Sequence, residues 1–231
     1  MKRFYRDVTV AETAGAYEVR LDGKPLKTQR GAAQSVPTAG LAELLAAEWE
    51  QQGEQLDPAA FTFRDMADYA LDVVAPDPAA VADKLLAFAE TDTLCYRADP
   101  DEPFYRRQHA VWEPIVTACE ARENIALVRV SGVVHRPQAE ATLAALRARL
   151  AALDPFTLAA FDQLTALSAS LVVGLAALEP YADGKALWDA ANLEEIWQAE
   201  QWGKDAEAAE RTARREADFL AAMQFAAAVR S

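Results

Sequence analysis

Residues 17–28 read YEVRLDGKPLKT, and this stretch decides that the chain is not purely helical. Its first five residues alternate apolar and charged side chains, which is the two-residue period of a half-buried strand. Asp22-Gly23 follows where a tight hairpin turn requires positive φ, so Gly23 is predicted to be a structural residue. Alternation in residues 4–10 predicts a strand before this stretch, and residues 35–37 predict a short extended piece after it. The chain therefore opens with a β-hairpin or meander.

Helical spacing of the apolar residues begins after this sheet, at Thr38. Between residues 156 and 178 the apolar side chains surround much of the helix cylinder, which predicts one central, buried helix. Two further helices are predicted at about 184–202 and 204–229. An aspartate followed by proline, typical of an N-cap and first turn, marks helix starts at Asp57-Pro58, Asp77-Pro78 and Asp154-Pro155.

These patterns predict an α+β fold, in which a small N-terminal β-containing domain precedes a mainly α-helical bundle domain. The change of period places the boundary near Leu56-Asp57-Pro58, giving domains at residues 1–60 and 61–231. Two short segments inside the helical part, 93–97 and 125–130, have the composition of strands. We expect them to pair with each other or with the N-terminal sheet.

The 231 residues carry a net charge of −13, with 23 Lys and Arg against 36 Asp and Glu. Such an acidic surface disfavours nucleic acid and anionic lipid as partners. The longest uncharged apolar-rich run, residues 163–178, is shorter than the ~20 residues of a membrane span, so no membrane insertion is expected. The charge is uneven, because residues 1–30 hold seven Lys and Arg against four Asp and Glu, a net +3. A protein with two unlike modules is therefore expected.

The few cysteines and the first residues bear on the compartment. Two cysteines form no disulfide framework and no C-x-x-C pair. The start MKRFYRDV lacks the apolar core of a signal peptide, and its acidic residues argue against a transit peptide. We expect a cytoplasmic bacterial protein, or a mitochondrial matrix protein if the chain is a processed eukaryotic one.

Signals for nucleotide or metal chemistry are weak. The nine glycines form neither a P-loop nor a G-x-G-x-x-G motif, so no nucleotide cofactor is expected. Three aspartates spaced along one helix face could bind a cation, but a capping or solvated role is favoured because no second ligand set accompanies them: Asp65, Asp68 and Asp72. Four other side chains match no metal-ligand spacing, and we expect no metal or catalytic site from them: Cys95, His109, Cys119 and His135.

Residues 193–205, LEEIWQAEQWGKD, are the most informative stretch for function. At 100° per residue a polar stripe forms with Trp202 at its edge, and its members are Glu194, Gln198, Gln201 and Asp205. This stripe is either a plain solvent face or a recognition surface, because aromatic residues beside hydrogen-bonding groups are typical of interface hot spots. Trp49, in contrast, shares helical spacing with Leu41 and Leu45, so it is predicted to be structural.

Five stretches follow one another along the chain: RFYRDVTV and LDGKPLKT near the start, then AAEWEQQGEQLDP, TDTLCYR and finally LEEIWQAEQWG. In this order they resemble one family, the chaperones that assemble the catalytic head of F-type ATP synthase. The resemblance covers nearly the whole chain. The family implies an N-terminal β-containing domain joined to a helical bundle, and a non-enzymatic chaperone that works without ATP hydrolysis.

The resemblance also implies a partner and a site. Family members bind the unassembled alpha subunit and shield the surface that later meets a beta subunit. Glu194, Gln198 and Trp202 match the family's motif, so we expect them to contact this partner, and the chaperone itself to be a monomer. Two other interpretations stay open: a hydrolase or metal-dependent enzyme using acidic residues with His109 or His135, and a scaffolding subunit that stays in its complex.

Overall fold

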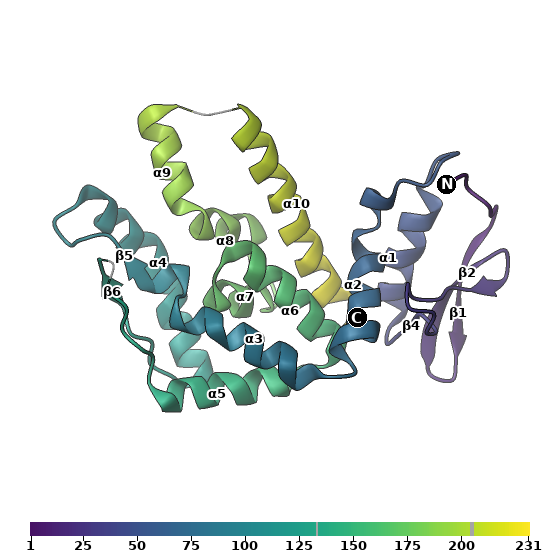
Figure 1. Ribbon diagram of the computed structural model, residues 1–231, viewed down its shortest axis with the longest axis horizontal. Coiled ribbons are helices and arrows are strands. Elements are labelled where there is room, and N and C mark those ends of the chain that lie inside the picture. The colour runs from purple at the N-terminus through teal and green to yellow at the C-terminus, as the bar shows by residue number, and fades with distance from the viewer. Residues whose placement is uncertain (133, 204–205) are drawn as a thin grey trace. The chain divides into compact units, whose positions relative to one another are not determined.

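The computed structural model describes residues 1–132, 134–203 and 206–231 (Figure 1). It has a small N-terminal strand region followed by mostly helices, which confirms the predicted α+β class. Among the described residues, none of the helices has both the length and the apolar character needed to cross a bilayer. The chain forms two compact units. The first unit consists of Met1–Pro78, Asp154–Ala160 and Ala221–Ser231, and the second of Ala79–Leu153 and Phe161–Leu220.

The first unit contains an antiparallel sheet in which strand β2 (Ala16–Leu21) is central. β1 (Val8–Thr13) pairs with one edge of β2, while the short β3 (Lys24–Pro25) and β4 (Ser35–Val36) pair with the other. The predicted hairpin is confirmed, since Gly23 has φ +79° in the turn between β2 and β3.

The first strand is shorter than the sequence predicts, because β1 begins at Val8 and not at residue 4. Earlier residues bond instead to the end of helix α1 and to the segment that follows it. The Arg3 amide donates to the carbonyl of Glu54 over 2.9 Å, and the Tyr5 hydroxyl donates to the carbonyl of Trp49 over 2.5 Å. These long-range bonds take the place of strand pairing.

Helix α1 (Ala39–Glu50) packs against β1 and β2 (Figure 1). Thr38 caps it, because the Thr38 hydroxyl accepts the amide of Leu41 over 3.2 Å. Near its end Trp49 is 7% exposed, with the rings of Tyr5 and Phe61 at 5.5 and 4.5 Å between centroids. Trp49 is thus a core side chain, and its contribution to stability stays a prediction.

The first unit continues beyond residue 60 through a 3-10 turn (Pro58–Ala60), helix α2 (Thr62–Tyr69) and a π-helical turn (Ala70–Val74). Glu48 of α1 joins α2 to this unit. Its carboxylate accepts hydrogen bonds from the backbone amides of Phe63 and Arg64, at the start of α2, over 2.6 and 2.8 Å. The first segment of the first unit therefore ends at Pro78. The change from strand-like to helical spacing of the apolar residues lies earlier, near residue 60. The predicted domains, residues 1–60 and 61–231, stay a prediction.

The second unit consists of helices with one two-stranded ribbon. Helices α6 and α10 also contribute residues to the first unit, and so does α3 through its first residue, Pro78. A 3-10 turn at Thr93–Cys95 precedes strand β5. The helices and strands are α3 (Pro78–Glu90), β5 (Tyr96–Arg97), α4 (Pro103–Glu123), β6 (Val130–Ser131), α5 (Glu140–Ala151), α6 (Pro155–Ser168), α7 (Leu171–Ala177), α8 (Gly184–Ala191), α9 (Leu193–Trp202) and α10 (Ala206–Ala228).

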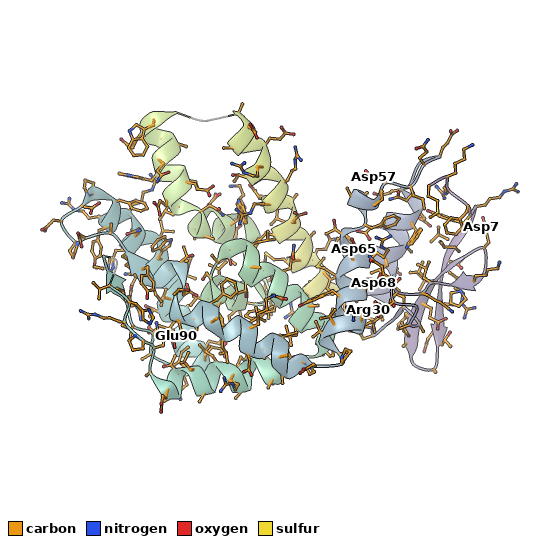
Figure 2. The ribbon with its side chains drawn as sticks, in the orientation of Figure 1. Asp7, Arg30, Asp57, Asp65, Asp68 and Glu90 are labelled. Carbon is orange, nitrogen blue, oxygen red and sulfur yellow. The ribbon has the colours of Figure 1, made fainter. Side chains whose placement is uncertain are left out.

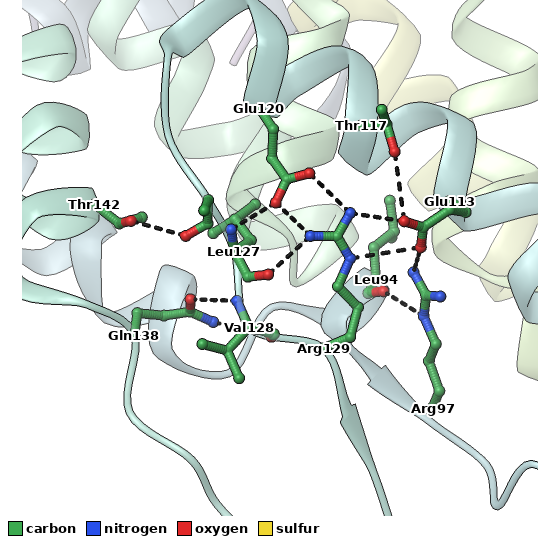
Figure 3. Close-up of polar contacts among 11 residues, drawn as sticks. Leu94, Arg97, Glu113, Thr117, Glu120, Leu127, Val128, Arg129, Gln138 and Thr142 are labelled. Carbon is green, nitrogen blue, oxygen red and sulfur yellow. Dashed lines mark hydrogen bonds and ion pairs between the residues drawn. The ribbon is translucent and has the colours of Figure 1, made fainter.

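The two short strands predicted within the helical part pair with each other in parallel. This is one of the two arrangements expected from the sequence. They are shorter than predicted, and an ionic network fixes their flanks to α4 (Figure 3). Arg129 bonds to Glu113 at 2.9 Å and to Glu120, while Arg97 pairs with Glu113 at 2.7 Å. Arg129 lowers the pKa of both glutamates, and Arg97 also lowers that of Glu113, although burial raises both pKa values.

The single helix expected over residues 156–178 is wrong, because the structure has a break between α6 and α7. Ala169 adopts φ +50°, and Ser170 caps α7 by accepting the amide of Val173. Asp92, fully buried, accepts the Ser170 hydroxyl over 2.7 Å and the Val172 amide over 3.0 Å. A carboxylate distant in sequence therefore stabilises the break.

The helix expected at 184–202 is likewise divided, into α8 and α9 at Asn192. The Asn192 side-chain amide donates to the carbonyl of Trp188 over 2.8 Å, which ends α8 locally. The last predicted helix corresponds to α10, and its residues 204 and 205 lie outside the described residues.

Candidate functional site

Helix α9 presents the predicted polar stripe to solvent. Glu194 and Gln198 are exposed, and the Gln198 amide donates to the Glu194 carboxylate over 3.2 Å. Trp202, in the last turn, is 79% exposed, and Gly203 ends the helix with φ +91°. Gln201 is also exposed, whereas Asp205 lies outside the described residues. The stripe therefore combines hydrogen-bonding groups with a large, exposed aromatic ring.

The opposite side of α9 packs against the start of α4. The rings of Trp197 and Phe104 lie 5.5 Å apart, and the Arg107 guanidinium lies 5.5 Å from the Trp197 ring centre. Arg107 also bonds to both carboxylate oxygens of Glu200, one of them over 2.9 Å. This bond lowers the pKa of Glu200 below its ordinary value. We name Phe104, Arg107, Trp197 and Glu200 the α4–α9 clasp.

Sequence reasoning missed the α4–α9 clasp. Nothing in the spacing of Phe104 or Arg107 indicates a partner 93 residues away. Trp197 carried one signal, since an aromatic residue off the polar stripe must find another surface. The clasp fixes α9 without using Glu194, Gln198 or Trp202, and these three stay exposed to solvent.

Protein donors occupy the acidic stripe of the first unit, formed by Asp65, Asp68 and Asp72, and Figure 2 labels the first two of these. Asp68 accepts the amide of Gln29 over 3.1 Å and the side-chain amide of Gln34 over 2.6 Å. Asp72 accepts the Thr28 hydroxyl over 2.8 Å. Burial raises the pKa of Asp68, against the effect of these hydrogen bonds. The carboxylates thus hold the loop between β3 and β4, which agrees with the favoured capping role.

The two cysteines and two histidines do not form one cluster. His109 accepts a hydrogen bond from Arg97 over 3.3 Å, whereas His135 bonds to the Tyr96 hydroxyl over 2.7 Å. Both thiols are buried, and burial raises the pKa of Cys119 to about 12. Such thiols are poor nucleophiles at neutral pH. In the part of the chain that the structure describes, no three His, Cys, Asp or Glu side chains are placed to hold a metal ion.

Solved structures share this fold over nearly the whole chain. The crystal structure of Atp12 from Paracoccus denitrificans matches with a TM-score of 0.93 and 35% identity, over 99% of this chain and 98% of that one. Atu1473 from Agrobacterium tumefaciens matches with a TM-score of 0.94 and 38% identity, over 98% and 85%.

Sequence comparison then gives the family. Residues 2–120 match the family described as ATP12 chaperone protein. Protein atp12, mitochondrial, from Schizosaccharomyces pombe is 24% identical over 214 residues, which are 87% of this chain and 74% of that protein. The chain belongs to the ATP12 chaperone family, whose members act in ATP synthase assembly.

Proposed function

We propose that this chain is an ATP-independent chaperone that binds the unassembled alpha subunit of F-type ATP synthase and promotes assembly of the catalytic head. Membership in the ATP12 family supports the assembly role. The observation that carries the binding site is the open face of α9, where Trp202 is 79% exposed beside Glu194 and Gln198. The proposed compartment is the bacterial cytoplasm, or the mitochondrial matrix for a eukaryotic member.

The chemistry of this face suits reversible binding. Covering a large exposed aromatic ring with a partner protein makes the free energy of binding more favourable. Neighbouring amide and carboxylate groups fix the geometry of the contact. A face of this kind makes a small, partly polar interface. Another subunit can replace such an interface by competition, without hydrolysis of ATP. The chain is therefore proposed to act by binding and not by catalysis.

Aggregation of purified alpha subunit tests the proposal. Equimolar chain should keep the subunit in solution with or without ATP, and Trp202→Ala should weaken binding by about 30-fold, because buried interface tryptophans contribute ~2 kcal/mol or more. Glu194→Gln and Gln198→Ala should weaken it less. Tyr181→Asn is the matched control: Tyr181 is also a fully exposed ring, it lies outside α9, and its φ of +66° suits asparagine.

Three outcomes would overturn parts of the proposal. If the unaltered chain does not keep the alpha subunit in solution, the alpha subunit is not its partner. If folded Glu194, Gln198 and Trp202 variants bind the subunit as tightly as the unaltered chain, the face of α9 is not the binding site. The same conclusion follows if Tyr181→Asn weakens binding as much as Trp202→Ala does. Stoichiometric retention of the chain in the mature enzyme would make it a scaffolding subunit and not a chaperone.

A further inference from the structure

The outer edge of β1 is an open strand edge. One edge of β1 pairs with β2, and in the described chain no strand pairs with its other edge. The register joins all six residues of β1 to β2 without a bulge, from Val8 opposite Leu21 to Thr13 opposite Ala16. A strand of this length spans about 20 Å.

Hydrogen-bond alternation shows which backbone groups face outward. The tight turn makes Thr13 and Ala16 a hydrogen-bonded pair, and the Asp22 amide donates to the Asp7 carbonyl over 2.9 Å in the same phase. Residues 7, 9, 11 and 13 therefore bond toward β2. The backbone N–H and C=O groups of Val8, Val10 and Glu12 point away from it, and among the described residues they have no hydrogen-bond partner.

This edge lacks the devices that normally block strand addition. Natural edges carry lysine, proline or a bulge, or are covered by another element. The sequence of β1, VTVAET, has neither lysine nor proline, Glu12 is its one charged side chain, and its register is regular. The edge also presents apolar surface, because Val10 is 36% exposed and Phe4, just before the strand, is 61% exposed. Left open in this way, the edge is suited to receive another strand.

Charge and size indicate what kind of strand fits. The chain carries a net charge of −13, and the charged side chains in and beside β1 are Arg6, Asp7 and Glu12. Two copies of the chain would repel each other through their net charge. Six paired residues also bury far less than the ~800 Å² per partner of a stable dimer. A transient, extended segment of another protein suits this edge better than a second copy.

We propose that the outer edge of β1 binds an extended segment of the unassembled client by antiparallel strand addition. The proposal rests on the proposed function, since the client is the alpha subunit. The main-chain bonds of strand addition are independent of side-chain sequence, and alternate apolar side chains of the segment would cover Val10. This edge would be a second contact, in addition to the face of α9.

Proline at position 10 tests the edge selectively. Val10→Pro removes an outward N–H and leaves the bonds toward β2 intact, so the chain should still fold, as edge strands tolerate proline. Binding of purified alpha subunit should weaken about tenfold, the equivalent of one lost hydrogen bond. Val10→Thr is the control, because it keeps the outward N–H and should bind like the unaltered chain.

Hydrogen exchange gives a second readout that does not depend on a variant. On adding the alpha subunit, the amides of Val8, Val10 and Glu12 should become protected, whereas those of Thr9, Ala11 and Thr13 are protected throughout. If folded Val10→Pro binds as tightly as the unaltered chain and the alternating protection is not seen, strand addition at the outer edge of β1 is overturned. The proposed function is then unaffected. A chain that does not bind the subunit at all overturns both. Dimerisation that Val10→Pro abolishes would instead show that a second copy occupies the edge.

Discussion

The carboxylate of Asp92 stabilises a structure that no local sequence signal specifies. It is fully buried and accepts the Leu94 amide over 3.0 Å as well as the bonds from Ser170 and Val172. Burial raises its pKa from 3.8 to about 6, although each of these bonds lowers it. Desolvation therefore outweighs three hydrogen bonds, and the ionised form is held at a cost in folding free energy.

The pH dependence of stability should report this cost. Between pH 4 and 6 the folded chain holds the Asp92 proton while the unfolded chain releases it, so the contribution of Asp92 to stability falls as the pH rises, by up to about 3 kcal/mol. Carboxylates with lowered pKa values give the opposite slope, and they include Asp22, Glu113, Glu120 and Glu200.

Asp92→Asn isolates this contribution, because the other carboxylates are common to both chains. The variant should be less stable at pH 4 by ~1–3 kcal/mol, since its amide group faces backbone donors. The difference in unfolding free energy between the two chains, measured with urea, should shrink toward pH 6. A difference that is constant with pH would show that Asp92 titrates near its ordinary pKa.

The helices show where sequence reasoning succeeds and where it stops. The hairpin at Asp22-Gly23 was predicted because its cause, positive φ in a two-residue turn, is local. The break at Ala169 was not, because its apolar neighbours continue a helical pattern while the stabilising carboxylate is 78 residues away. The same limit applies to the candidate site. The stripe on α9 is visible from spacing alone, but its support by Arg107 is a contact between distant segments.

The α4–α9 clasp should therefore affect client binding more than stability. Exposed ion pairs contribute little to folding, so Arg107→Glu should barely change the free energy of unfolding. It places two carboxylates together and should release α9, which weakens alpha-subunit binding by about fivefold to tenfold. The double variant Arg107→Glu with Glu200→Arg restores opposite charges and should recover binding. Unchanged binding in the single variant would show that the clasp does not orient the face of α9.

The two compact units share helices, and this has a consequence for how the whole chain unfolds. Residues 221–231, the end of α10 and the residues after it, belong to the first unit, where the Thr38 hydroxyl donates to the carbonyl of Ala228 over 2.6 Å. The preceding part of α10 belongs to the second unit, where Phe219 lies 5.6 Å from the ring of Trp188. One helix therefore supplies core residues to both units.

Two buried phenylalanines in α10 allow a matched test of this division. Phe219 and Phe225 are both fully buried, and replacing either with alanine should cost ~3–5 kcal/mol. If the units open separately, hydrogen exchange should accelerate in β1, β2 and α1 for Phe225→Ala, and in α8 for Phe219→Ala. Each variant is the control for the other, because helix, residue type and burial are the same. Equal acceleration throughout the chain in both variants would mean instead that the molecule unfolds as one cooperative body, and that the sheet has no stability separate from the helices.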